Sequence, residues 1–199
     1  HHKMNDIANG KDNVNALDTL LAAERAVYTY GYHIYFTSNH DENSWAGTEF
    51  ERMGDGHKTF AALCATLDGM PLMYSGQEEP LRKRLAFFEK DTIPFKDYAY
   101  EEFYTTLNQL KKKNQALWNG EHGGLSRRIN ESNEVYAFIR EKNGDKFIGV
   151  FNLSGKPQKT TLQVPVTEMN IVFTDDRLTL DTGQNINLGP WEFFLFSTK

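Results

Sequence analysis

Two short apolar segments in the N-terminal half constrain the fold more than any other feature of the sequence. Residues 32–37 (YHIYFT) and 69–76 (GMPLMYSG) are strand-like and too apolar for a sheet with one face in water. Predicted helices precede, separate and follow them, and this alternation indicates parallel strands covered by helices. Because two strands cannot form such a sheet alone, we expect this half to be the end of a larger α/β domain.

Hydrophobic spacing and end signals predict the helices. Residues 15–27 place leucines and a valine on one face, and residues 58–67 form an apolar, alanine-rich run. Residues 101–113 begin with two glutamates and end with three lysines, which is the charge distribution that the helix dipole favours. These three segments are therefore predicted as helices.

The pattern changes between Asn114 and Gly124, and the remainder of the chain is predicted to be all β. Residues 134–140 and 146–153 flank an Asn143-Gly144 pair, which is typical of a tight hairpin. Further strands are expected at residues 160–164, 170–174, 177–180 and 192–196, separated by Gly, Pro and Asp. Short strands at such spacing predict an antiparallel β-sandwich.

Composition excludes several functional classes. Lys and Arg number 22 against 27 for Asp and Glu, so no overall positive charge attracts nucleic acid or an anionic membrane. No segment approaches the roughly 20 apolar residues that a membrane-spanning helix needs, and the start lacks the pattern of a signal peptide. The single cysteine, Cys64, lies in an apolar run and is predicted to pack in the core. His1 and His2 fit either a tag remnant or an internal start within a longer protein.

The most informative polar residues follow the first predicted strand. Asn39, His40 and Asp41 are consecutive, and active sites of closed parallel barrels gather at the C-terminal ends of strands. The pattern therefore favours a polar site that contains a carboxylate and an imidazole. A turn that caps the next helix explains the same residues equally well.

Two motifs resemble those of a known family. Residues 36–41 (FTSNHD) resemble the FxxNHD motif that closes the seventh barrel strand in the α-amylase superfamily. Residues 69–78 resemble its eighth-strand motif, G-x-P-x-x-Y-x-G-x-E. The resemblance implies an α/β plus all-β fold: residues 1–114 would hold the last βα units of a (β/α)8 TIM barrel. Residues 115–199 would form the C-terminal antiparallel β-sandwich.

The resemblance also implies a function for this site. It suggests part of a retaining enzyme that hydrolyses α-1,4-glucosidic bonds in starch-like polysaccharides. Asp41 resembles the third catalytic carboxylate, which stabilises the transition state without attacking or protonating the substrate. His40, beside it, resembles the histidine that hydrogen-bonds the same glucose unit, and Asn39 is predicted to contact substrate with it. Such hydrogen bonds can strengthen as positive charge develops on the sugar.

Two further substrate contacts are predicted, each with an open alternative. Arg84 matches a loop arginine that binds sugar, although an exposed arginine flanking a helix is the simpler explanation. Trp45 is placed to stack on a pyranose ring or to pack in the core. Trp118 and Trp191 are predicted to be packing anchors.

The chain lacks most of the catalytic machinery that the family implies. A retaining glycosidase needs a nucleophile and a general acid about 5 Å apart, and the family takes both from its fourth and fifth strands. No such segment occurs here, and Glu78 and Glu79 are interpreted as structural loop residues. We therefore expect the isolated chain to be inactive.

Several properties are implied only for a full-length parent. Its expected partners are an α-glucan and the N-terminal portion of the same enzyme. The resemblance allows calcium in a small inserted domain of the parent, and no metal ligand or cofactor is predicted in this segment. Secretion or a periplasmic location is expected of a polysaccharide-degrading parent. The alternatives are a transglycosylase of the same superfamily and a non-catalytic carbohydrate-binding or structural fragment.

Overall fold

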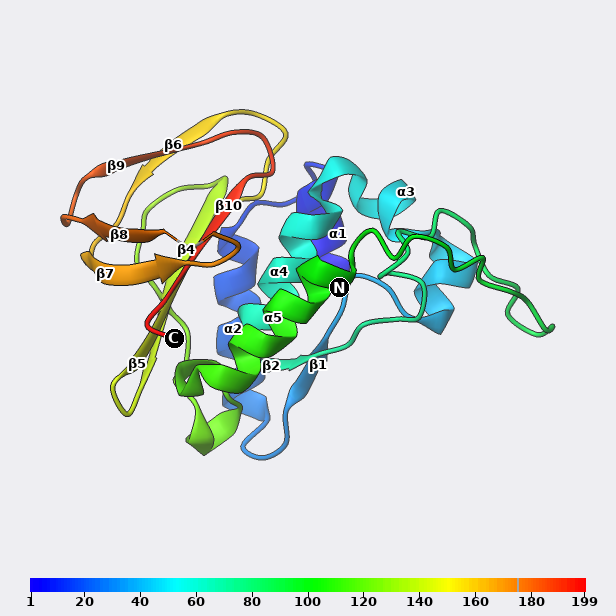
Figure 1. The fold of residues 1–199 in the computed structure, drawn as a ribbon, viewed down its shortest axis with the longest axis horizontal. Coiled ribbons are helices and arrows are strands. Elements are labelled where there is room, and N and C mark those ends of the chain that lie inside the picture. The colour runs from blue at the N-terminus through cyan, green and yellow to red at the C-terminus, as the bar shows by residue number, and fades with distance from the viewer. Residues whose placement is uncertain (175) are drawn as a thin grey trace.

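Two parallel strands and a group of helices form the N-terminal part of the molecule (Figure 1). The computed structural model describes residues 1–174 and 176–199. Strands β1 (His33–Tyr35) and β2 (Gly69–Pro71) pair in parallel, with Ile34 opposite Met70. The helices are α1 (His2–Ala8), α2 (Asn15–Val27), α3 (Glu49–Met53), α4 (His57–Thr66) and α5 (Glu101–Lys113). The bounds of α2 and α5 are those predicted from the sequence, whereas α3 was not predicted.

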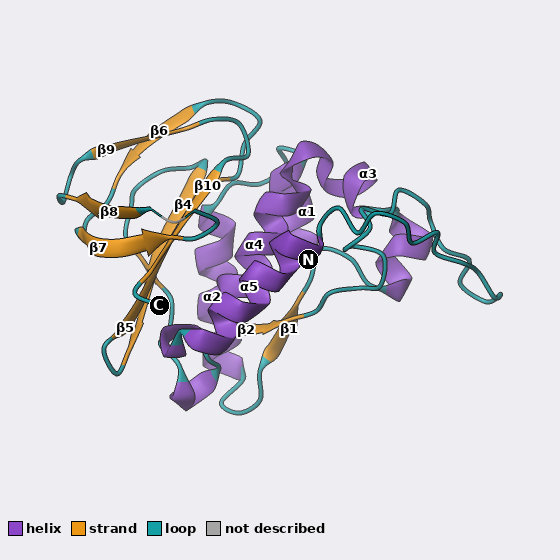
Figure 2. Ribbon diagram, viewed as in Figure 1, coloured by secondary structure: helices purple, strands orange, loops and turns teal. Residues whose placement is uncertain are grey.

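The C-terminal part is an antiparallel β-domain, as predicted (Figure 2). The described residues form a sheet in the order β3-β4-β5-β10-β7-β8 and a two-stranded sheet of β6 and β9. Strand bounds are β3 (Arg127–Arg128), β4 (Val135–Lys142), β5 (Asp145–Asn152), β6 (Gln158–Thr161), β7 (Val166–Ile171), β8 (Arg177–Leu180), β9 (Asn185–Leu188) and β10 (Phe193–Ser197). The sequence did not predict β3 or β9, and β6 and β7 begin before their predicted ranges.

The larger sheet buries both of its faces. Along β4, Tyr136 and Phe138 join a core shared with the helices. Val135, Ala137 and Ile139 join a second core, which includes Leu162 just after β6 and residues of β9. This alternation is the period of two that places successive side chains on opposite faces of a strand. One face of the larger sheet therefore packs inside the β-domain, and the other face packs on the helical part.

A buried arginine joins the two parts of the chain. Arg140, on β4, is 1% exposed, and its guanidinium donates only to backbone carbonyl oxygens and faces Asp68. The acceptors, at 2.7–2.8 Å, are the carbonyl oxygens of Thr66, Leu67, Trp118 and Gly124. Four hydrogen bonds and a nearby carboxylate allow this buried guanidinium to remain charged.

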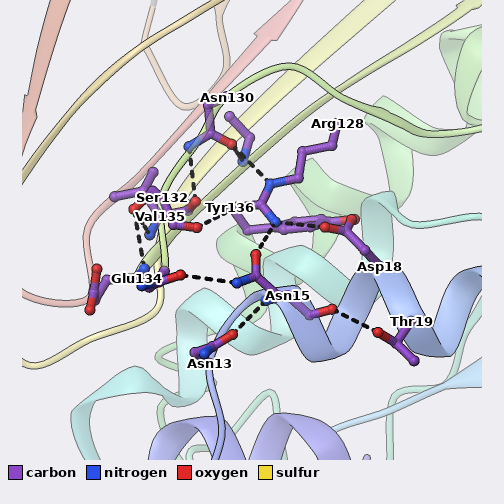
Figure 3. Close-up of polar contacts among 12 residues, drawn as sticks. Asn13, Asn15, Asp18, Thr19, Arg128, Asn130, Ser132, Glu134, Val135 and Tyr136 are labelled. Carbon is purple, nitrogen blue, oxygen red and sulfur yellow. Dashed lines mark hydrogen bonds and ion pairs between the residues drawn. The ribbon is translucent and has the colours of Figure 1, made fainter.

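A second group of polar contacts connects α2 to the β-domain, as Figure 3 shows. Arg128 donates to Asp18 at 2.6 Å and to Asn15 at 2.7 Å. The Tyr136 hydroxyl donates to Asp18 at 3.1 Å, and Asn15 donates to Asn133 at 2.9 Å. Residues more than 100 positions apart in sequence thus fix α2 against β3 and β4.

Local features follow the predictions with one exception. Asn143 and Gly144 have φ angles of 50° and 89°, as a tight hairpin requires, and Cys64 is buried. Trp191 packs on Gly56, where a Cβ atom would lie 2.8 Å from its ring, so Trp191 is confirmed as a packing anchor. Trp118 is instead 42% exposed, because it lies in the connection that precedes the sheet.

In residues 1–174 and 176–199 no helix is long and apolar enough to cross a bilayer.

Candidate active site

The turn after β1 presents His40 and Asp41 to solvent. The side chain of Asn39 accepts a hydrogen bond from the backbone N–H of Glu42 at 2.7 Å and so caps the helical turn that follows. His40 Nε2 lies 3.6 Å from Asp41 Oδ2, and their side chains are 68% and 55% exposed. The helix-capping interpretation is therefore confirmed for Asn39, while the imidazole and the carboxylate stay free to contact a ligand.

A buried arginine holds this turn against the end of β1. Arg52, on α3, donates to the carbonyl oxygen of Thr37 at 2.9 Å and pairs with Glu42 at 3.1 Å. Helix α3 itself begins with a capping box, in which Thr48 and Glu51 satisfy each other's backbone N–H groups. The position of Asp41 thus depends on α3, an element that the sequence analysis missed.

A buried polar cluster connects the ends of the two strands. Gln77, which follows β2, donates to Glu49 at 2.6 Å and to Thr37 at 2.8 Å, and Thr37 donates to Glu49 at 2.9 Å. All three side chains are buried, and burial raises the pKa of Glu49. Sequence reasoning gave no role to Gln77 or Glu49, because the pairs Gln77–Thr37, Gln77–Glu49 and Thr37–Glu49 are separated by 40, 28 and 12 positions in the chain.

The guanidinium of Arg84 forms an ion pair with Glu51. Arg84 Nη2 donates to Glu51 Oε1 at 2.9 Å and Arg84 Nε to Glu51 Oε2 at 3.0 Å. These bonds lower the pKa of Glu51 to about 2. A Cβ atom on Gly47 would lie 2.9 Å from Arg84 Nη2, so Arg84 lies at the far end of the helical turn that starts beside Asp41. Any sugar contact of Arg84 would compete with this ion pair.

Trp45 does not pack in the core. Its side chain is among the exposed large hydrophobic groups, at 61%. The ring lies 5.2 Å from that of Phe87, which in turn lies 5.9 Å from the His40 imidazole, centroid to centroid. Trp45, His40 and Asp41 therefore share one exposed surface, whereas sequence reasoning gave no role to Phe87.

Glu78 and Glu79 accept hydrogen bonds from backbone groups of their own loop. Glu78 accepts a hydrogen bond from the backbone N–H of Gly76 at 2.8 Å. Glu79 accepts backbone N–H groups of Lys96, Asp97 and Tyr98, which lower the pKa of its carboxyl group. This geometry agrees with their interpretation as structural residues.

One group of side chains in the described part of the chain has metal-ligand chemistry. Candidate ligand atoms of His1, His2 and Glu42 lie within 4.8 Å of one another. Calcium prefers six to eight oxygen ligands, so two imidazoles and one carboxylate do not fit it. Glu42 also pairs with Arg52, which already supplies the positive charge.

A cavity of about 380 Å³ lies at the opposite end of β1 from Asp41. Its lining includes Tyr28, Tyr30, Tyr32 and His33, which precede or begin the strand. The cavity therefore lies at the end of the strands away from His40 and Asp41.

Comparison with known proteins gives a family match for the β-domain and a shared fold for the chain. Residues 127–195 match the family model described as the maltogenic amylase C-terminal domain. A comparison with curated protein sequences gave no match. Among solved structures, a noncanonic maltogenic α-amylase from Thermotoga neapolitana matches with a TM-score of 0.78 and 20% identity, over 98% of this chain and 48% of its own.

Two other solved structures give the same result. An α-amylase from Geobacillus thermoleovorans in complex with acarbose matches with a TM-score of 0.71 and 15% identity, over 93% of this chain and 43% of its own. A cyclomaltodextrin glucanotransferase with a three-domain ABC distribution matches at 0.68 and 15%, over 98% of this chain and 42% of its own. The chain spans a little under half the length of these structures. It has the fold of the C-terminal portion of α-amylase family enzymes, which confirms the resemblance drawn from the two motifs.

Proposed function

We propose that this chain is the end of a (β/α)8 barrel, with its C-terminal β-domain, in a retaining α-glucan hydrolase. The observation that carries the proposal is the position of Asp41. It lies beyond the C-terminal end of β1, beside His40, and the parallel strand β2 ends on the same side. The C-terminal ends of barrel strands are where such enzymes build their active sites.

The exposed face of β1 and β2 supports the proposal that they belong to a barrel. Tyr35 is buried against the helices, whereas Ile34 and Met70, opposite each other in register, are 51% and 39% exposed. In a closed barrel one face of each strand packs on helices and the other fills the interior with apolar side chains. Further strands of the parent enzyme would cover Ile34 and Met70.

Asp41 would act on the transition state of glycoside cleavage. As the bond breaks, positive charge develops on the anomeric carbon and the ring oxygen. A fixed carboxylate stabilises that charge and accepts hydrogen bonds from sugar hydroxyl groups, and His40 can donate to the same unit. Neither side chain is asked to attack or protonate the substrate.

The nucleophile and the general acid would come from the upstream part of the parent, as would any calcium site. In this proposal the substrate is a starch-like α-1,4-glucan, and the acarbose complex of the Geobacillus neighbour supports an oligosaccharide of this kind. The isolated chain would then be inactive, because the catalytic groups act as a unit.

A transglycosylase is the second candidate. The structural likeness to a cyclomaltodextrin glucanotransferase favours it, because the same residues can pass the glycosyl unit to a sugar hydroxyl instead of water. Product analysis distinguishes the two, since transfer yields oligosaccharides longer than the substrate.

The test is to assay this chain alone and as part of the full-length parent on maltoheptaose. We expect no turnover by the chain alone and α-anomeric products from the parent, followed by NMR before mutarotation. Turnover by the chain alone, or β-anomeric products, would contradict the proposal. A parent that binds glucan without cleaving it would favour a non-catalytic carbohydrate-binding protein.

A further inference from the structure

We propose that Trp45, Phe87 and Phe88 form a platform that binds glucose units of the α-glucan away from the cleaved bond and favours longer substrates. This inference rests on the proposed function. It assigns a binding role to Phe87 and Phe88, which the two family motifs do not include, and it names chain length as the property that they select.

The three rings form a continuous exposed array. Centroids of Trp45 and Phe87 lie 5.2 Å apart, those of Phe87 and Phe88 4.8 Å, and those of Trp45 and Phe88 6.0 Å. Phe88 is 84% exposed, more than any other phenylalanine among the exposed hydrophobic groups. Contiguous exposed apolar side chains of this kind mark binding surfaces.

The loop that carries the two phenylalanines is fixed. The segment between β2 and α5 contains neither helix nor strand and extends away from the body in Figure 1. Contacts of Asp91 nevertheless hold its tip in one conformation. Asp91 accepts the backbone N–H groups of Ala86 at 2.9 Å and Thr92 at 2.7 Å and pairs with Lys83. The chain therefore positions Phe87 and Phe88 before any ligand arrives.

The same loop is tied to the helical turn that carries Trp45. Asn43 accepts the backbone N–H of Leu85 at 2.7 Å, and the Ser44 hydroxyl donates to the Leu85 carbonyl at 2.8 Å. These bonds hold the loop beside Trp45. A preorganised surface loses less conformational entropy on binding.

Continuity with Asp41 identifies the occupant as a glucan. The His40 ring stacks at 5.9 Å on Phe87, and His40 Nε2 lies 3.6 Å from Asp41 Oδ2. A sugar chain held at Asp41 can thus continue over the platform, where the apolar C–H faces of glucose units would stack on the rings. A polypeptide partner is the competing occupant, and the experiment below distinguishes it.

The experiment measures kcat/KM for maltotriose and maltoheptaose with the full-length enzyme and its Phe88→Ala and Trp45→Ala variants. We expect the ratio of the longer to the shorter substrate to fall about three- to tenfold in each variant, the size of one aromatic stacking interaction. The matched control is Phe95→Ala. Phe95 is an exposed phenylalanine of the same segment that stacks on Tyr98 at 5.3 Å, and its removal should leave the ratio unchanged.

An unchanged ratio in Phe88→Ala and Trp45→Ala would overturn the platform. Equal losses on both substrates with a lowered melting temperature would also overturn it, because they would show that the rings pack against another part of the protein. If Asp41→Asn abolishes activity while the ratio is unchanged in the platform variants, only the platform fails. If Asp41→Asn is fully active, the proposed function fails as well.

Discussion

Arg140 Nε lies 3.6 Å from Asp68 Oδ1, inside the contact between the β-domain and the segment that leads into β2. Burial lowers the pKa of Arg140 to about 10, so the guanidinium remains charged at neutral pH. Asp68 also pairs with Arg25 of α2 and accepts the backbone N–H of Ser126. One carboxylate and one guanidinium therefore hold α2, the start of β2 and β4 together.

Replacing Arg140 with Met should destabilise the protein by about 3–5 kcal/mol, because it leaves buried carbonyl oxygens without donors and removes a charge that faces Asp68. Denaturant unfolding of the full-length enzyme measures the effect. Arg127→Met is the matched control, since Arg127 is exposed on β3 and its loss should change the free energy of unfolding by less than about 0.5 kcal/mol. Equal effects of the two substitutions would contradict this account.

Glu49 should make stability fall as pH rises. Its raised pKa means that the folded protein holds this proton more tightly than the unfolded chain does. The carboxyl group therefore contributes stability below its ordinary pKa of 4.5 and loses that contribution as pH rises through the folded value. Glu49→Gln should therefore gain stability relative to the wild type as pH rises above 4.5.

Glu51 provides the control of opposite sign for this experiment. Its pKa is lowered to about 2, so its contribution is present above pH 4.5 and is lost as pH falls through about 2. Relative to the wild type, Glu51→Gln should be least stable at neutral pH. Parallel unfolding curves for the Glu49→Gln variant and the wild type at every pH would show that Glu49 is not perturbed by burial.

Asp91→Asn should loosen the loop that presents Phe87 and Phe88. Lys83 and two backbone N–H groups lower the pKa of Asp91 to about 2, so the native carboxylate keeps these contacts throughout the range above pH 4 and loses them as pH falls through about 2. The variant should lose part of the preference for maltoheptaose at pH 7. Glu89→Gln, an exposed acid of the same loop, is the control.

The sequence predicted those elements that depend on neighbours along the chain. Helices α2 and α5 and the hairpin at Asn143-Gly144 follow from spacing, end charges and turn chemistry within a few residues. Strand β9 was missed because its identity as a strand comes from pairing with β6, about 27 residues earlier, for example Thr160 opposite Ile186.

The candidate site likewise contains residues that a local pattern predicts and residues that it does not predict. Asn39, His40 and Asp41 were found because they directly follow a recognisable strand and complete a motif. The side chains that support or extend the site, Arg52, Gln77 and Phe87, lie on other segments, and only the folded structure shows that they meet. Local patterns do not encode contacts between distant residues.

Exposed strands should make the isolated chain associate. Within the described residues β1 and β2 pair only with each other, and Ile34 and Met70 face solvent. Light scattering should detect oligomers of the chain alone, and Ile34→Thr combined with Met70→Thr should reduce them. A stable, monodisperse monomer of the unaltered chain would show that these strands need no further partner.

The turnover number of Asp41→Asn in the full-length enzyme tests the central claim most directly. We predict that kcat on maltoheptaose falls at least about 10²–10³-fold, with a much smaller change in KM, because the carboxylate acts mainly on the transition state. Asp55→Asn, at an exposed aspartate before α4, should keep the wild-type kcat. A kcat of Asp41→Asn equal to that of Asp55→Asn would contradict the account and leave Asp41 as a residue of the capped turn after β1.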